Sequence, residues 1–154
     1  MSQNWGSWTP YEPTIDAMIT GTTDPVLSSN GSHTSKAAYQ QNGVWVIAHG
    51  EIVFGNTGVN AGDGVYCPTL PVPARADRAQ ILGVGYVTDA SDDTLIRVCS
   101  LATEPSAIGG DNFVFVLDQG KMQLGSGLVG SSVPWTWAAG DSLLFQVEYE
   151  AATS

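Results

Sequence analysis

The stretch Val133-Pro134-Trp135-Thr136-Trp137-Ala138-Ala139-Gly140-Asp141-Ser142-Leu143-Leu144-Phe145-Gln146-Val147-Glu148-Tyr149-Glu150-Ala151-Ala152 decides the fold of this chain. Its second half alternates between apolar and polar side chains with a period of two, which is the pattern of a half-buried strand. The side chains expected to face the core are Leu143, Phe145, Val147 and Tyr149. Those expected to face solvent include Gln146, Glu148 and Glu150, and only Leu144 breaks the alternation. The chain is therefore predicted to end in a strand held within a sheet.

The first half of the stretch predicts an extended run followed by a turn. Pro134 fixes its own φ and keeps the residue before it out of the helical region. Trp135 and Trp137 are two residues apart, so in an extended chain they point to the same side. The pair Gly140-Asp141 then turns the chain into the closing strand.

Composition indicates one domain of short strands and excludes two classes of partner. The chain has 154 residues, and only 13% of them are charged, while Gly and Pro are frequent. The net charge of −10 repels phosphate backbones, so no nucleic-acid partner is expected, and it repels anionic membranes as well. The N-terminus has no signal-peptide pattern, and no apolar run has membrane-spanning length.

Short extended segments separated by turns fill the rest of the sequence. The clearest is a hairpin over 39–46, in which Asn42-Gly43 is predicted to occupy the centre of a type I′ turn. Gly50 is expected to mark a bulge or bend in the long strand that follows. The other predicted strands are 15–20, an edge segment 67–73, 79–88, a buried strand 94–102 and a second hairpin 112–124 with its turn at 118–120. The predicted loops are 21–35, 55–64 and 103–110. No window shows a helical period, so the chain is predicted to be an all-β sandwich or barrel of eight or nine strands.

Residues 1–14 form an aromatic, proline-rich segment, and residues 15–154 are expected to form the single β-sandwich domain. The prolines predict an extended arm without ladder hydrogen bonds. Exposing its large aromatic side chains is unfavourable, so the arm must lie against its own domain or against a neighbouring subunit. The aromatic residues proposed for a subunit or capsid interface are Trp5, Trp8, Tyr11, Trp135 and Trp137. Stacking of tryptophans on sugar rings is the less favoured alternative.

The carboxylates do not form a recognisable catalytic pair. Asp92-Asp93 is expected at a turn, and Glu148 and Glu150 on the wet face of a strand, so all are interpreted as solvated charges. Asp63 lies between glycines, but the spacing of a calcium-binding loop is missing.

The other reactive side chains give no site either. His33 and His49 are too few for a metal centre, and no Gly-x-Ser-x-Gly elbow is present. Cys67 and Cys99 are interpreted as buried free thiols, with a disulfide as the alternative. We therefore predict no catalytic residue, no cofactor and no metal ion, and a protein that is not an enzyme.

Several segments resemble a family of small β-sandwich domains in virion proteins of tailed phages that infect actinobacteria. The matching segments are Trp8-Thr9-Pro10-Tyr11-Glu12-Pro13-Thr14, Tyr39, Asn42-Gly43-Val44-Trp45-Val46, Gly50-Glu51-Ile52, Gly62-Asp63-Gly64-Val65-Tyr66, Leu70-Pro71, Pro134-Trp135-Thr136-Trp137-Ala138, Gly140-Asp141 and Tyr149-Glu150-Ala151-Ala152. The family usually carries a basic pair where this chain has Gln40-Gln41. The resemblance implies a jelly-roll-like sandwich, usually trimeric, without catalytic residues.

Two functions follow from this resemblance. The first is a capsid decoration protein that binds the assembled shell, through the major capsid protein, as a homotrimer. The absence of a shaft, coiled coil or collagen-like repeat in the sequence favours it. The alternative is a tail-tip or tail-fibre receptor-binding module whose loops 21–35, 55–64 and 103–111 recognise a host glycan. Both functions place the protein in the virion. The number of copies in each virion distinguishes a capsid decoration protein from a tail module.

Overall fold

The computed structural model describes residues 6–92, 95–117 and 127–154, and it is built almost entirely from antiparallel strands. The elements are β1 (Thr9–Tyr11), β2 (Ile15–Met18), β3 (Thr34–Asn42), β4 (Trp45–Val53), β5 (Val65–Pro68), β6 (Ile81–Thr88), β7 (Ile96–Ala102), α1 (Pro105–Ile108), β8 (Val114–Leu117) and β9 (Ser142–Glu150). The predicted all-β sandwich of eight or nine antiparallel strands is confirmed. The turn and second strand of the predicted hairpin 112–124 lie outside the described residues.

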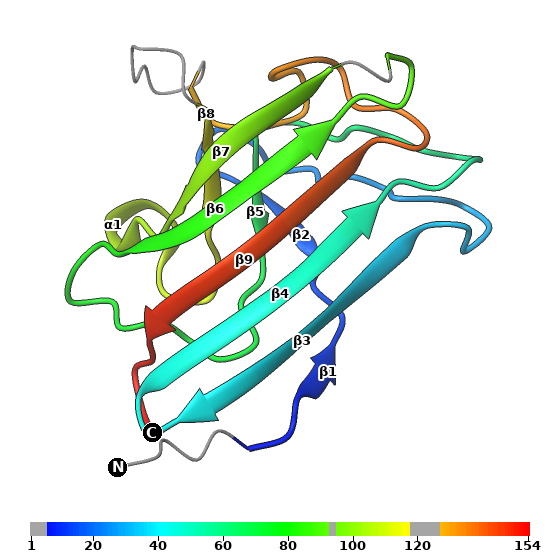
Figure 1. The fold of residues 1–154 in the computed structure, drawn as a ribbon. Coiled ribbons are helices and arrows are strands. Elements are labelled where there is room, and N and C mark those ends of the chain that lie inside the picture. Colours follow the sequence, from blue (N-terminus) through cyan, green and yellow to red (C-terminus); the bar gives the residue numbers. More distant parts are fainter. Residues whose placement is uncertain (1–5, 93–94, 118–126) are drawn as a thin grey trace.

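The strands form one large sheet with a small second layer on one side of it. The large sheet has the order β1-β3-β4-β9-β6-β7-β8, and the small sheet pairs β2 with β5. In Figure 1, β2 and β5 lie behind the large sheet, while β3, β4, β9, β6 and β7 cross in front of them. The two layers are joined beyond β8, because Val116 bridges Leu128 and Gly130 bridges Val65. The large sheet therefore has an inner face toward the core and an outer face that no described element covers.

The closing strand β9 lies in the middle of the large sheet, between β4 and β6. The side chains of β9 predicted to face the core are almost fully buried, namely Leu143, Phe145, Val147 and Tyr149. Tyr149 also donates a hydrogen bond from Oη to the carbonyl oxygen of Val72 over 2.7 Å. Gln146 and Glu148 point outward and are exposed. Period-two patterning thus reports correctly on the face of the sheet that the second layer covers.

The ring of Phe145 occupies space that Gly50 leaves free, and a second glycine lies opposite it on the other side. Gly50 of β4 and Gly85 of β6 are its direct neighbours on either side. A Cβ atom at Gly50 would lie 2.8 Å from Cζ of Phe145 and 2.5 Å from Cβ of Ala37. The ring packs edge-on against Phe113, with the two centroids 5.2 Å apart. Glycine inside these strands therefore marks a close approach of a large side chain to the backbone.

Two local predictions around the first hairpin are wrong in detail. Asn42 pairs with Trp45, so the two-residue loop is Gly43–Val44 instead of Asn42–Gly43. Only Gly43 in this loop has a positive φ, of 62°, which is the pattern of a type II′ turn rather than type I′. Gly50 does not form a bulge, because the pairing of β4 with β3 runs through it without a register shift. The bulge lies instead in β6, between Ile81 and Gly83.

Two further segments differ from the prediction. The stretch after Pro134 is not a strand. Val133 is joined to Pro134 by a cis peptide bond and makes only an isolated bridge, to Gly130. The strand predicted as buried over 94–102 is buried on one face only, because Ile96 and Val98 point outward and are exposed. A strand with apolar side chains on both faces is predicted from its sequence to be buried on both faces. The sequence does not show whether both faces are covered in the monomer.

Buried polar groups fasten the loops to the sheet. The carboxylate of Asp141 accepts hydrogen bonds from the backbone N–H of Ala90 (2.9 Å) and of Ala138 (2.8 Å). Burial raises the pKa of Asp141, and these two N–H donors oppose the rise. The side-chain amide of Asn112 donates to the carbonyl oxygen of Cys67 and to a carboxylate oxygen of Asp16, both over 2.9 Å. These contacts satisfy polar atoms that would otherwise be buried without a partner.

An ion-pair network holds the end of β9. Glu150 accepts hydrogen bonds from Arg75 and from Arg78, each over 2.8 Å, and Arg75 also contacts Asp77 over 2.7 Å. The hydrogen bonds from the two guanidinium groups lower the pKa of Glu150, and the bond from Arg75 has the largest effect. The helix α1 has four residues, and no helix in the described ranges has the length and apolarity to span a membrane.

We predict that Gly50→Ala lowers the free energy of unfolding by about 1–3 kcal/mol, because the added methyl group must displace Phe145 or the backbone of β3. Urea unfolding at neutral pH measures the change. Gly6→Ala is the matched control, since no atom lies within 4 Å of the position of its Cβ, and it should leave stability unchanged. Equal stability of the two variants would contradict the packing described for Phe145.

We also predict that the stabilisation from Glu150 depends on pH. Its pKa is lowered in the folded state, so the contribution is complete above the unfolded value of about 4.3 and is lost as the pH falls through the folded-state pKa. Glu150→Gln should therefore lower the urea midpoint at pH 7, and the difference from wild type should shrink at pH 3.

The matched control for this prediction is Glu148→Gln, on the same strand. Glu148 makes no ion pair among the described residues, so its substitution should leave the midpoint nearly unchanged at both pH values. A difference between Glu150→Gln and wild type that stays constant from pH 7 to pH 3 would refute the role of the network.

Candidate interaction surface

The outer face of the large sheet divides into an apolar half and a polar half. The apolar half lies on β6 and β7, and its members are the exposed side chains Ile81, Val84, Tyr86, Ile96 and Val98. The pairing register places them together, because Tyr86 lies opposite Val98 and Val84 opposite Ser100. Leu144 of β9 lies opposite Tyr86 and extends this apolar half toward the middle of the sheet. Contiguous exposed apolar patches of this kind mark interaction sites in soluble proteins.

No charged side chain lies among the outward residues of β6 and β7 in the apolar half. This contrasts with a chain whose net charge is −10. Two copies of such an acidic protein repel each other, and the repulsion is weakest where neither copy presents a carboxylate. The apolar half is therefore the part of the outer face best suited to contact with a second copy.

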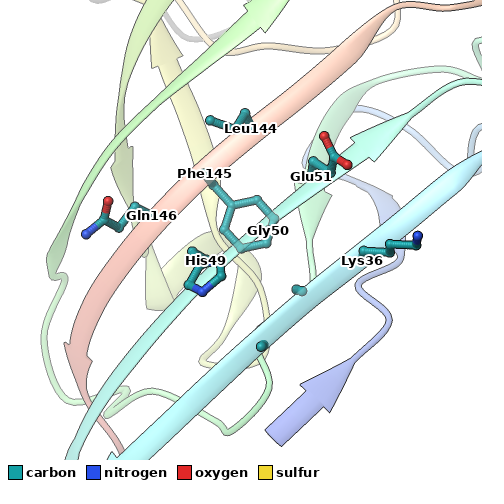
Figure 2. A pocket seen from close by; sticks show the side chains of 9 residues that line it. Lys36, His49, Gly50, Glu51, Leu144, Phe145 and Gln146 are labelled. Carbon is teal, nitrogen blue, oxygen red and sulfur yellow. The ribbon is translucent and has the colours of Figure 1, made fainter. Parts of the chain in front are cut away.

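The polar half lies on β3, β4 and β9 and contains two adjoining hollows. Figure 2 shows the first hollow, with Lys36 from β3, His49 and Glu51 from β4 and Gln146 from β9. It has a volume of about 570 Å³. The second hollow, of about 650 Å³, shares His49 and Gln146 with the first and reaches Trp8 and Val84. Both hollows are shallow and open widely to solvent.

The N-terminal arm crosses onto this polar half within the same chain. β1 pairs with β3 at the edge of the sheet, and Gln40 donates a hydrogen bond to the carbonyl oxygen of Gly6. The rings of Trp8 and His49 meet edge-on, with their centroids 4.7 Å apart. Trp8 nevertheless keeps 45% of its surface exposed. The described part of the arm thus lies on its own domain while presenting one free aromatic face.

The aromatic residues proposed for an interface occupy different environments. Trp5 lies outside the described residues, and Trp8 is exposed. The prediction that Trp137 lies at a subunit or capsid interface is corrected by its burial. Only 2% of its surface is exposed, because its ring packs in the core against Phe54 and Tyr66. It is therefore not available on the surface of the monomer.

The two remaining candidates, Tyr11 and Trp135, are partly buried. Tyr11 packs edge-on against Tyr39, and Trp135 lies beside the buried ring of Trp137 with their centroids 5.6 Å apart. Tyr11 Oη and Trp135 Nε1 are buried and have no hydrogen-bond partner of good geometry. Trp135 nevertheless lies close enough to the Asp141 carboxylate to lower the pKa of Asp141. Burial raises the pKa of Tyr11.

The residues considered for metal binding or nucleophilic catalysis are hydrogen-bonded or buried within the fold. Asp63 Oδ1 accepts hydrogen bonds from the backbone N–H of Thr22 (2.7 Å) and Thr23 (2.8 Å), so it fastens one loop to another. Cys67 and Cys99 are buried free thiols, and burial raises the pKa of Cys67 to about 12 and that of Cys99 to about 11. Within the described ranges, no three His, Cys, Asp or Glu side chains are grouped to hold a metal ion.

Two of the three loops assigned to glycan recognition, 21–35 and 55–64, contact each other through hydrogen bonds. Val26 and Asn60 exchange backbone hydrogen bonds of 2.8 and 3.0 Å, and Ser29 donates to the carbonyl oxygen of Thr57 over 2.9 Å. His33 meets Ser28 through its Nδ1 atom over 2.6 Å. The loops 21–33 and 54–64 therefore form one paired unit on the side of the small sheet.

Sequence reasoning missed the polar half of the outer face. His49 and Gln146 are far apart in the sequence and become neighbours only through the pairing of β4 with β9. The alternation of β9 indicated that Gln146 points outward, but no local pattern indicates which residue lies beside it. No protein-family model, curated protein or solved structure matches the chain.

Proposed function

We propose that the protein is a structural, non-enzymatic component of a bacteriophage virion that decorates the assembled capsid as a homotrimer. The observation that carries the proposal is the uncharged apolar half of the outer face, formed by Ile81, Val84, Tyr86, Ile96 and Val98 on β6 and β7. The resemblance of the sequence to phage virion domains supplies the setting, and the major capsid protein is the expected partner.

The energetic scale supports self-association through the whole apolar half. Full burial of one Val or Ile side chain contributes about 1.5–3 kcal/mol. The four Val and Ile side chains of the apolar half, Ile81, Val84, Ile96 and Val98, therefore supply a gross gain of at most about 6–12 kcal/mol, because they are 55–85% exposed before association. Association costs about 4–15 kcal/mol in lost translational and rotational freedom. A stable oligomer thus needs these side chains to be covered together, and one charge placed among them should oppose it.

The acidic surface suits a protein that is made in many copies and then added to a shell. A net charge of −10 keeps free copies soluble and apart, while the apolar half offers a neutral contact. The closing strand pairs with β4 and β6, and the two loops bond to each other, all within one chain, so these surfaces form without the particle.

We predict that the purified protein binds to saturation on capsids that lack it. Val98→Glu should weaken this binding by at least about tenfold, because burying an unpaired charge in a subunit contact costs several kcal/mol. Co-sedimentation of protein with capsids over a range of concentrations measures both effects.

Val26→Glu is the matched control for this experiment. It makes the same chemical change at an exposed valine in the loop between β2 and β3, away from the outer face, and it should bind as wild type does. Absence of saturable binding by the wild-type protein would overturn the proposed function. Equal binding of the two glutamate variants would show that the apolar half plays no part.

A further inference from the structure

The outer face also contains a groove that self-association does not explain. The two adjoining hollows run across β3, β4, β9 and the start of β6, and they meet at His49 and Gln146. Small residues make room for them, since Ala38, Gly50 and Gly83 line the two hollows. Val84 at the far end belongs to both the groove and the apolar half.

The polar side chains along this groove are not used by the fold. The set comprises Lys36, His49, Glu51, Gln146 and Glu148. Within the described part of the chain, none of them makes a hydrogen bond or an ion pair, and His49 has only its ring contact with Trp8. Glu150, at the end of the same strand, contrasts with them because two arginines hold its carboxylate. Donors and acceptors along the groove are thus free to meet a ligand.

Trp8 distinguishes this groove from an ordinary solvated sheet face. The arm holds its ring at the wall of the second hollow, against His49, with nearly half of its surface free. An aromatic ring beside unpaired polar groups offers one flat apolar contact and several directional ones. Sugars match this combination, because their C–H faces pack on aromatic rings and their hydroxyl groups both donate and accept hydrogen bonds.

We propose that the groove between Trp8, His49 and Gln146 binds a neutral oligosaccharide. Neutrality follows from charge: Glu51 and Glu148 outnumber Lys36 along the groove, in a chain of net charge −10. Anionic sugars are therefore repelled. The two hollows adjoin at His49 and Gln146, so a chain of sugar rings can occupy both, whereas a single ring occupies one. This activity is additional to shell binding and rests on different side chains.

The test uses the purified full chain and a panel of neutral trisaccharides made of glucose, galactose, mannose or N-acetylglucosamine. Saturation-transfer NMR identifies a binder, and titration calorimetry measures its dissociation constant, expected at or below about 1 mM. Trp8→Ala and Gln146→Ala should each weaken binding at least tenfold. Circular dichroism of each variant verifies that the fold is retained.

Trp45→Ala is the matched control. Trp45 lies on the same outer face with 49% of its surface exposed, close to the 45% of Trp8, but it lines neither hollow. It should bind the sugar as wild type does. The proposal is overturned if no panel member binds, or if Trp8→Ala and Trp45→Ala bind equally. Because the assay contains no capsid, its failure leaves the proposed shell binding to its own test.

Discussion

Two glycines opposite Phe145, Gly50 of β4 and Gly85 of β6, fix the register of β9 in the large sheet. The ring of Phe145 lies against Gly50, and a Cβ atom at Gly85 would meet the carbonyl oxygen of Leu144 and the ring of Phe115. Both glycines therefore let β4 and β6 approach β9 closely in one register. A shift of one residue would turn every inward side chain of β9 to the outer face. The fixed register places His49 beside Gln146, and Tyr86 beside Leu144. The composition of the outer face is therefore a consequence of how the inner face packs.

The unequal size of the two layers explains why this protein offers so much surface for interaction. Among the described residues, seven strands form one layer and two form the other, with loops completing the cover of the inner face. The outer face is left to solvent across β3, β4, β9, β6 and β7 (Figure 1). Its apolar half suits contact with other copies, and its polar half has the room and the free polar groups for a ligand. One sheet thus carries a core on one side and two kinds of surface on the other.

The sequence allowed the fold class and the buried face of β9 to be predicted, because alternation depends only on local geometry. Other features depend on what covers a side chain. Val98 and Ile96 have the residue types of a buried strand, yet nothing described covers their face. Trp137 and Trp8 looked alike as interface candidates, although one lies in the core and the other is exposed. The groove could not be predicted, since strand pairing brings its residues together from distant parts of the chain.

In the proposed homotrimer, a second and a third copy cover the apolar half of the outer face. Sedimentation equilibrium of the purified wild-type protein tests it most directly, because the method reports mass without a capsid or ligand. We expect the mass of three chains of 16.1 kDa, independent of concentration across the micromolar range. A mass of one chain throughout that range would contradict the claim, since the apolar half would then remain exposed in the free protein.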